Sequence, residues 1–151
     1  MKYLLFRTNH DWTGLIIRLT TGLVLFPHGA QKMLGWFGGP GFAGEMHHLT
    51  GVAQLPSLVA VLVIFIEFFG SLSLITGLAS RIWAAAFIGL FTGIILVAHK
   101  DYGFFMNWFG HQKGEGFEYH LLIIGLSIAT LVNGSGRYAL DSAILKAEKP
   151  N

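Results

Sequence analysis

The sequence predicts an all-α fold, namely an integral membrane bundle of four helices joined by aromatic-rich interfacial loops. Hydrophobic residues make up 53% of the 151 residues and charged residues only 12%, whereas soluble globular domains carry about 25% charged residues. The mean hydropathy is +0.58. Four apolar segments approach the ~20 residues that a helix needs to cross a bilayer. This length and composition predict a single four-span domain over residues 1–151.

The first three predicted spans differ in how apolar they are. The first, 12–34, is long enough but carries four polar or charged residues: Arg18, His28, Gln31 and Lys32. The second, 58–78, is apolar except for Glu67 and three hydroxyl side chains. The third, 82–99, is the most uniformly apolar. All three segments therefore satisfy the length requirement for a membrane helix.

The fourth predicted span, 116–133, is the shortest in its strictly apolar part, which corresponds to roughly 20 Å of helix. To cross the hydrocarbon it must begin near residue 116, and this start places Glu118 and His120 inside the membrane boundary. The polar residues 142–151 are predicted to form a flexible tail.

Basic residues predict the orientation of the spans. In a four-span chain both termini and the turn after the second span share one side, which holds Lys2, Arg7, Arg81, Arg137, Lys146 and Lys149. The opposite side holds Lys32, Lys100 and Lys113. Because cytoplasmic segments carry the excess of Lys and Arg, we expect both termini to be cytoplasmic.

Two segments on the opposite side are rich in aromatic residues. Segment 35–56 contains Trp36, Phe37 and Phe42, and segment 101–117 contains Phe104, Phe105, Trp108 and Phe109. Aromatic side chains concentrate at the headgroup level of membranes. We therefore expect both loops to lie on or dip into the interface, either as a lid over the helices or as simple anchors.

Composition also excludes several classes of function. The net charge is only +2 and the basic residues do not cluster, so nucleic acid is not an expected partner. The sequence has no cysteine, which excludes disulfides, a thiolate nucleophile and an iron–sulfur cluster held by cysteines. No haem or flavin motif is visible, and the histidine spacing predicts no metal site. Redox chemistry would therefore need a bound cofactor, a quinone, or a metal held by histidine and carboxylate side chains.

Titratable residues from three predicted helices fall at a similar depth. At 1.5 Å per residue from the cytoplasmic edge, His28, His99, Glu118 and His120 lie ~20–27 Å deep. Glu67 lies ~16 Å deep, near the midplane. Charged residues at membrane depth are costly and are candidates for function. We expect these groups to converge in one outer-leaflet pocket.

Helical periodicity predicts which faces point inward. One stripe of the first span combines small, apolar and charged residues: Arg18, Thr21, Gly22, Leu25, His28, Gly29 and Lys32. The depths of Arg18 and Glu67 differ by ~7 Å, which an arginine side chain can bridge. Because an unpaired buried charge is strongly destabilising, we expect an Arg18–Glu67 ion pair. By contrast, His47, His48 and His111 are expected to be solvated loop residues.

Four short motifs follow one another between residues 11 and 141: Arg18 with His28-Gly29-x-x-Lys32; Glu67-x-x-Gly70 with Gly77 and Arg81; Glu118-Tyr119; and Gly134-Ser135-Gly136-Arg137-Tyr138-Ala139-Leu140-Asp141. Together they resemble the signature of the DoxX family of small four-helix membrane proteins. In the last motif Ser135 and Ala139 stand where the family usually has Pro and Ser.

The resemblance implies a bacterial or archaeal inner-membrane protein associated with redox work. Members of the family include a thiosulfate:quinone oxidoreductase subunit, a partner of superoxide dismutase in an oxidoreductase assembly, and proteins linked to quinone or catechol stress. The likeness carries His28, Lys32, Glu67 and Glu118 over as candidate site residues.

The resulting hypothesis is a redox component in the lipid bilayer that binds a quinone or similar lipophilic small molecule, as a subunit of a quinone-linked oxidoreductase. Quinone reduction takes up two protons, so it needs titratable groups within hydrogen-bond reach. The candidate catalytic residues are His28, Glu67, Glu118 and His120. The candidate cofactor-binding residues are Arg18, Lys32, His99 and Tyr119. Electrons would come from a partner such as a soluble redox enzyme or from a diffusible reductant, and a homo-oligomer is left open.

Two alternatives belong to other classes. A proton-coupled transporter or permeation component would also use a buried Glu67 and a layer of histidines, although no inverted repeat is visible. A structural subunit that scaffolds a soluble oxidoreductase would need the charges only to hold its helices in register.

Overall fold

The computed structural model describes residues 6–147, and within that range every regular element is helical. The long elements are α2 (Trp12–Leu34), α4–η3–α5 (Ser57–Phe65, Ile66–Gly70, Ser71–Thr76), α6–η4–η5 (Ser80–Ile94, Ile95–His99, Lys100–Tyr102) and α7 (Glu118–Asn133). The short elements are η1 (Trp36–Gly38), α3 (Gly41–His47), η2 (His48–Val52) and α8 (Leu140–Ala147). The all-α prediction is confirmed.

The long helices begin and end at residues whose chemistry explains the boundary. The Asp11 carboxylate caps α2 by accepting a hydrogen bond of 2.7 Å from the Gly14 N–H. The same helix ends at Gly35, whose φ of 73° is a left-handed conformation that glycine adopts without strain. The turn between α5 and α6 likewise contains Gly77, with φ of 70°.

The four long segments share one cluster of buried apolar side chains, consisting of Leu25, Leu74, Phe87, Phe91 and Ile123. Helix α2 reaches this cluster because its glycines allow close approach. A Cβ atom at Gly29 would lie 2.6 Å from the backbone of Phe68, and one at Gly22 would lie 2.9 Å from the Ser71 carbonyl oxygen. Small residues at such crossings allow helix backbones to pack closely.

Two helical segments are long and apolar enough to cross a membrane by length and composition, namely Ser57–Thr76 and Ser80–Tyr102. The 16-residue helix α7 is apolar but shorter. Large apolar side chains are exposed on all four long segments, among them Ile16, Leu58, Leu96 and Leu122. Such a surface is suited to lipid contact.

The structure corrects three predicted boundaries. Segment 35–56, expected to be a loop, contains the helical elements η1, α3 and η2. The fourth long helix begins at Glu118 rather than near residue 116. Residues 142–147 belong to α8 instead of a flexible tail, because Asp141 at the start of α8 is tied to the α5–α6 turn. Residues 148–151 lie outside the described residues.

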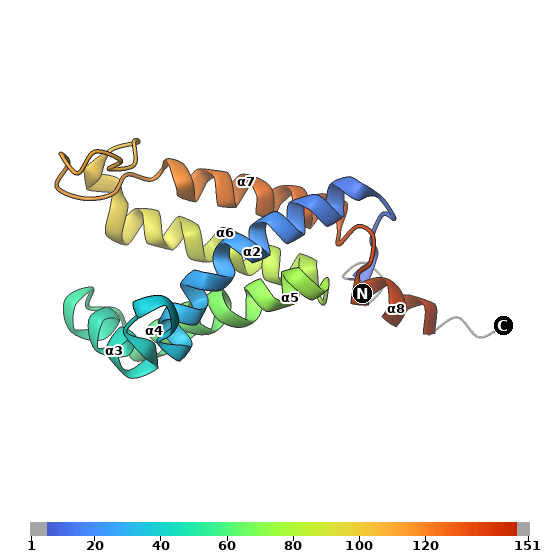
Figure 1. Ribbon diagram of the computed structural model, residues 1–151, viewed down its shortest axis with the longest axis horizontal. Helices are drawn as coiled ribbons and strands as arrows, with labels where there is room; N and C mark the ends of the chain where they lie inside the picture. Colours follow the sequence, from blue (N-terminus) through green and yellow to red (C-terminus); the bar gives the residue numbers. More distant parts are fainter. Residues whose placement is uncertain (1–5, 148–151) are drawn as a thin grey trace.

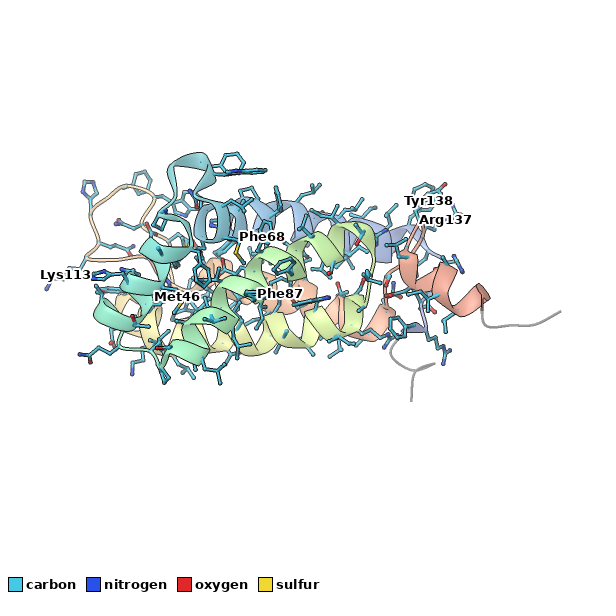
Figure 2. All side chains as sticks on the ribbon, turned by 90° about the horizontal axis from the view of Figure 1, so that it is seen from below. Met46, Phe68, Phe87, Lys113, Arg137 and Tyr138 are labelled. Carbon is cyan, nitrogen blue, oxygen red and sulfur yellow. The ribbon has the colours of Figure 1, made fainter. Side chains whose placement is uncertain are left out.

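The molecule is elongated, and its two ends are built differently (Figure 1). One end carries α8 and the segment that precedes α2, and we call it the terminal end. The other end carries α3 and the segment between η5 and α7, and we call it the cavity end. Figure 2 shows Arg137 and Tyr138 at the terminal end and Lys113 at the opposite end, with Phe87 between them.

Candidate functional site

The ion pair of Glu67 is formed with Lys32, and the predicted Arg18–Glu67 pair is wrong. The Lys32 Nζ lies 2.5 Å from the Glu67 Oε1. The Glu67 side chain is only 3% exposed and that of Lys32 24% exposed. Gly29, one turn before Lys32, packs against the backbone of Glu67 and Phe68, which brings Lys32 within reach of the carboxylate.

Arg18 binds backbone carbonyl groups at the terminal end. It is 1% exposed, and its guanidinium donates to the carbonyl oxygens of Ser135, Leu74, Ile75, Arg137 and Tyr138 at 2.6–3.0 Å. Leu74 and Ile75 lie in the last turn of α5, where carbonyl groups lack a partner within the helix. Arg18 therefore joins α5 to the segment before α8, and the structure places it outside the candidate site.

A cavity of about 380 Å³ lies beside the Lys32–Glu67 pair. Four polar residues line it, namely Lys32, Glu45, His48 and His99, and we call this part of the lining its polar end. The remaining wall is almost entirely apolar and comes from α3, α4, α6 and their neighbours: Leu49, Ala53, Leu55, Val59, Val63, Gly89, Leu90, Gly93, Ile94, Val97 and Ala98. A largely apolar cavity with a few convergent polar groups is typical of a small-molecule site.

His99 is held in a defined orientation at the edge of this cavity. It lies in η4, a π-helical turn, and its Nδ1 is 2.7 Å from the Glu115 carbonyl oxygen. A carbonyl oxygen only accepts hydrogen bonds, so Nδ1 carries the proton. The Nε2 of neutral His99 is then an acceptor. Glu67 also lies in a π-helical turn, η3, and such turns are frequent at functional sites.

His120 and Tyr119 lie behind His99. The centroids of the His99 and His120 rings are 4.2 Å apart. His120 is 6% exposed, and its Nδ1 and the Tyr119 hydroxyl are buried without a hydrogen-bond partner among the described residues. Unsatisfied buried polar atoms are uncommon in folded proteins and require an explanation.

These residues form one electrostatically connected group, which we call the polar cluster: Lys32, Glu67, His99, Tyr119 and His120. Glu67 lies within electrostatic reach of Tyr119. Lys32 and His99 likewise lie close enough to His120 to interact with it electrostatically. The cluster therefore combines proton donors and acceptors at one end of an apolar cavity. In the part of the chain that the structure describes, no three side chains are placed to hold a metal ion.

His28 does not join the polar cluster. Its side chain is exposed, and its ring centroid lies 6.2 Å from that of Tyr119. At 100° per residue, His28 lies about 70° from the middle of the inward stripe of α2. Gly29 instead occupies the face that contacts η3. The expectation that His28 points inward is therefore wrong.

Glu118 orders the segment before α7 instead of facing Glu67. Its carboxylate accepts hydrogen bonds from the Met106 N–H at 2.9 Å and the Trp108 indole N–H at 3.3 Å. It lines a different cavity, of about 440 Å³, together with Phe104 and Trp108. The expected single pocket of His28, Glu67 and Glu118 is not formed.

Two residues at the cavity were missed by the sequence-based prediction. Glu45 is 8% exposed although it lies in the segment expected to be a loop. His48 is exposed, as predicted, and yet lines the cavity. The i, i+3 spacing of Glu45 and His48 places them on one helical face, so a helical reading of this segment would have grouped them.

Comparisons with known proteins agree with the resemblance in the sequence. The DoxX family model matches residues 14–100, which include Lys32, Glu67 and His99. A Bacillus subtilis (strain 168) protein named "Putative oxidoreductase CatD" is 30% identical over 135 residues, which cover 89% of this chain and 89% of that protein. No solved structure matches the chain significantly.

The DoxX family is membrane-associated, in keeping with the two helical segments that are long and apolar enough to cross a bilayer. The match to the family model spans more than half of the chain, and the curated relative aligns with 89% of it. The chain belongs to the DoxX family.

Proposed function

We propose that this protein is a four-span inner-membrane component of a redox system and that its cavity binds a quinone or a similar lipophilic ring compound. The observation that carries the proposal is the buried Lys32–Glu67 pair at the polar end of an otherwise apolar cavity. The relative that is named as an oxidoreductase supports the redox assignment.

In the proposed topology, all four long segments cross the membrane, and not only the two that are long and apolar enough by length and composition. Helix α2 has 23 residues, which correspond to about 34 Å. Arg7, Arg81, Arg137 and Lys146 belong to the terminal end, and Lys32, Lys100 and Lys113 belong to the cavity end. The excess of basic residues at the terminal end favours a cytoplasmic location for it.

Labelling of introduced cysteines tests this topology without background, because the sequence has no cysteine. We expect a membrane-impermeant maleimide to label Lys113→Cys in intact cells. The same reagent should label His10→Cys only after lysis, since His10 precedes α2 at the terminal end. The opposite pattern would reverse the proposed orientation, and labelling of both residues in intact cells would exclude the three spans that the proposal places between them.

The polar end of the cavity provides the groups that quinone chemistry needs. The Lys32 ammonium is a donor suited to a ring carbonyl, and the His99 Nε2 is an acceptor suited to a hydroxyl of the reduced ring. Reduction of a quinone consumes two electrons and two protons and gives a quinol. Lys32 and His99 contact the cavity, with Glu67 and His120 behind them as proton reservoirs. A soluble oxidoreductase would supply the electrons.

Quinone titration of the purified protein in lipid nanodiscs tests the proposal. We expect saturable binding by the unmodified protein and at least about tenfold weaker binding by the Lys32→Met/Glu67→Leu double variant. Lys113→Met, which removes a comparable charge from an exposed position outside the cavity, is the matched control and should bind as the unmodified protein does.

Equal affinities in all three proteins, or no saturable binding in any of them, would refute the proposal. Co-purification of a soluble oxidoreductase with a chain that binds no quinone would instead support a structural subunit.

A further inference from the structure

The cavity is drawn out along α6 from a polar end to an apolar end. His99, Gly93 and Gly89 all line it. Ten residues separate Gly89 from His99, which corresponds to about 15 Å along the helix. The lining residues of this helical segment from Gly89 to Ala98 are all apolar, and His99 ends the row. In the proposed topology, the apolar end points toward the middle of the bilayer.

Gly89 and Gly93 keep this apolar end open. A Cβ atom added at either position would meet no atom of a neighbouring element within 4 Å. Gly22 and Gly29 behave differently, because a Cβ atom there would lie 2.6–2.9 Å from a neighbouring helix. The small residues on this face of α6 therefore leave room in the cavity instead of bringing two helices together.

The long side of the cavity opens between α4 and α6. Val59 of α4 and Val97 of η4 line the cavity and are both exposed. They belong to the two helical segments that are long and apolar enough to cross a membrane. The opening therefore faces the surroundings of these segments, which in the proposed topology is lipid.

We propose that the ligand is a ring compound with an apolar chain, and that it enters from the bilayer between α4 and α6. The ring occupies the polar end beside Lys32 and His99, and the chain lies along Gly93 and Gly89. This inference rests on the proposed function and adds to it the class of ligand and its route. A polar head and an apolar chain match the two ends of the cavity.

The experiment uses two ligands and two leucine variants. The ligands are 2,3-dimethoxy-5-methyl-1,4-benzoquinone and the same ring with a decyl chain. Gly89→Leu places a side chain in the path of the decyl chain. Gly125→Leu on α7 is the matched control, because Gly125 is also exposed, also has nothing within 4 Å of its Cβ position, and does not line the cavity.

We expect Gly89→Leu to weaken binding of the decyl compound about tenfold in phosphatidylcholine nanodiscs, as steric overpacking does. Its affinity for the ring without a chain should change less than about twofold, because the proposed ring contact at His99 is ten positions farther along the helix. Gly125→Leu should change neither affinity.

Four results would overturn this inference. If Gly89→Leu weakened binding of both ligands equally, the decyl chain would not lie along Gly89 in the cavity. The same would follow if Gly125→Leu weakened binding of the decyl compound. A change in oligomeric state with Gly89→Leu, and no change in ligand affinity, would identify the cavity as a contact between copies of this protein. Failure of both ligands to bind the unmodified protein would refute the proposed function itself, a result distinct from the first three.

Discussion

The two ends of the molecule use buried charge in different ways. At the terminal end, Arg18 donates to five carbonyl groups, and the Asp141 carboxylate accepts from the N–H groups of Ala79 and Ser80 and from the Ser135 hydroxyl. At the cavity end, Glu67 has one recorded partner, Lys32. The His120 Nδ1 and the Tyr119 hydroxyl there have none among the described residues.

This contrast separates a structural use of charge from a functional one. Arg18 and Asp141 complete the backbone hydrogen bonding of a helix terminus or a turn, so their replacement should cost stability. The cavity end keeps polar groups that lack full sets of partners, which a fold selected for stability alone would avoid. Burial and charge are common to both ends, and the partners of the titratable groups distinguish them, because the unpartnered atoms at the terminal end are the hydroxyls of Ser80 and Ser142.

The largest expected effect is loss of stability in Arg18→Met. The substitution removes the side-chain donor to the carbonyl groups of Ile75 and the segment before α8, and leaves the Leu74 carbonyl with only the Gly77 N–H. We expect the free energy of unfolding to fall by about 3–5 kcal/mol, as when one partner of a buried charge network is removed. Denaturant titration in detergent, followed by circular dichroism, measures this change.

The Lys32→Met/Glu67→Leu double variant is the counterpart at the cavity end. Replacing both members of a buried ion pair by apolar side chains is often neutral or stabilising, so we expect the free energy of unfolding to change by less than about 1 kcal/mol. If this double variant is destabilised as strongly as Arg18→Met, the polar cluster stabilises the fold as the charged groups at the terminal end do, and the two ends do not differ in this respect.

Substitution of glycine by alanine is expected to change stability by a smaller amount, and in opposite directions at Gly77 and Gly125. In Gly77→Ala the new Cβ atom would lie 2.7 Å from the Ala139 side chain, at a φ of 70°. We expect a loss of about 1–3 kcal/mol. Gly125→Ala has open space and sits inside α7, so helix propensity should add up to about 1 kcal/mol. Thermal unfolding of both variants in one detergent tests the pair.

An equal response at these two glycines would show that the packing at the terminal end is looser than the structure indicates. The contrast between the ends would then rest on the charged groups alone.

The sequence allows the long helices and several members of the polar cluster to be predicted. Helix α2 coincides with the predicted first span, 12–34, because a largely apolar segment is bounded by an N-cap residue, Asp11, and a C-cap glycine, Gly35. The depths calculated from residue numbers also predicted that His99 and His120 lie in the same layer of the membrane, and in the structure their rings are in contact. Depth along a helix follows directly from residue number.

The partners of the charged groups could not be predicted in the same way. Arg18 binds backbone carbonyl groups, and every residue carries one of those, so no side-chain pattern marks them. Glu67 and His99 lie in π-helical turns, which shift the face that later residues present and are not visible in a 3.6-residue periodicity. Glu45 was missed because glycine and aromatic residues around it indicate a loop, whereas tertiary contacts stabilise α3.

The smallest expected effect concerns His120 and tests the cavity end most directly. His120→Leu removes the buried Nδ1 that lacks a partner and fills similar space with an apolar side chain. We expect the free energy of unfolding to stay unchanged or rise by about 1 kcal/mol, because an unsatisfied polar group is no longer buried. We also expect loss of quinone-dependent proton uptake, measured with a pH indicator during reduction of the bound quinone. A residue that destabilises the fold and serves proton transfer should show both changes together. Marked destabilisation with intact proton uptake would make His120 a packing residue, and the incomplete hydrogen bonding at the cavity end would then have no functional meaning.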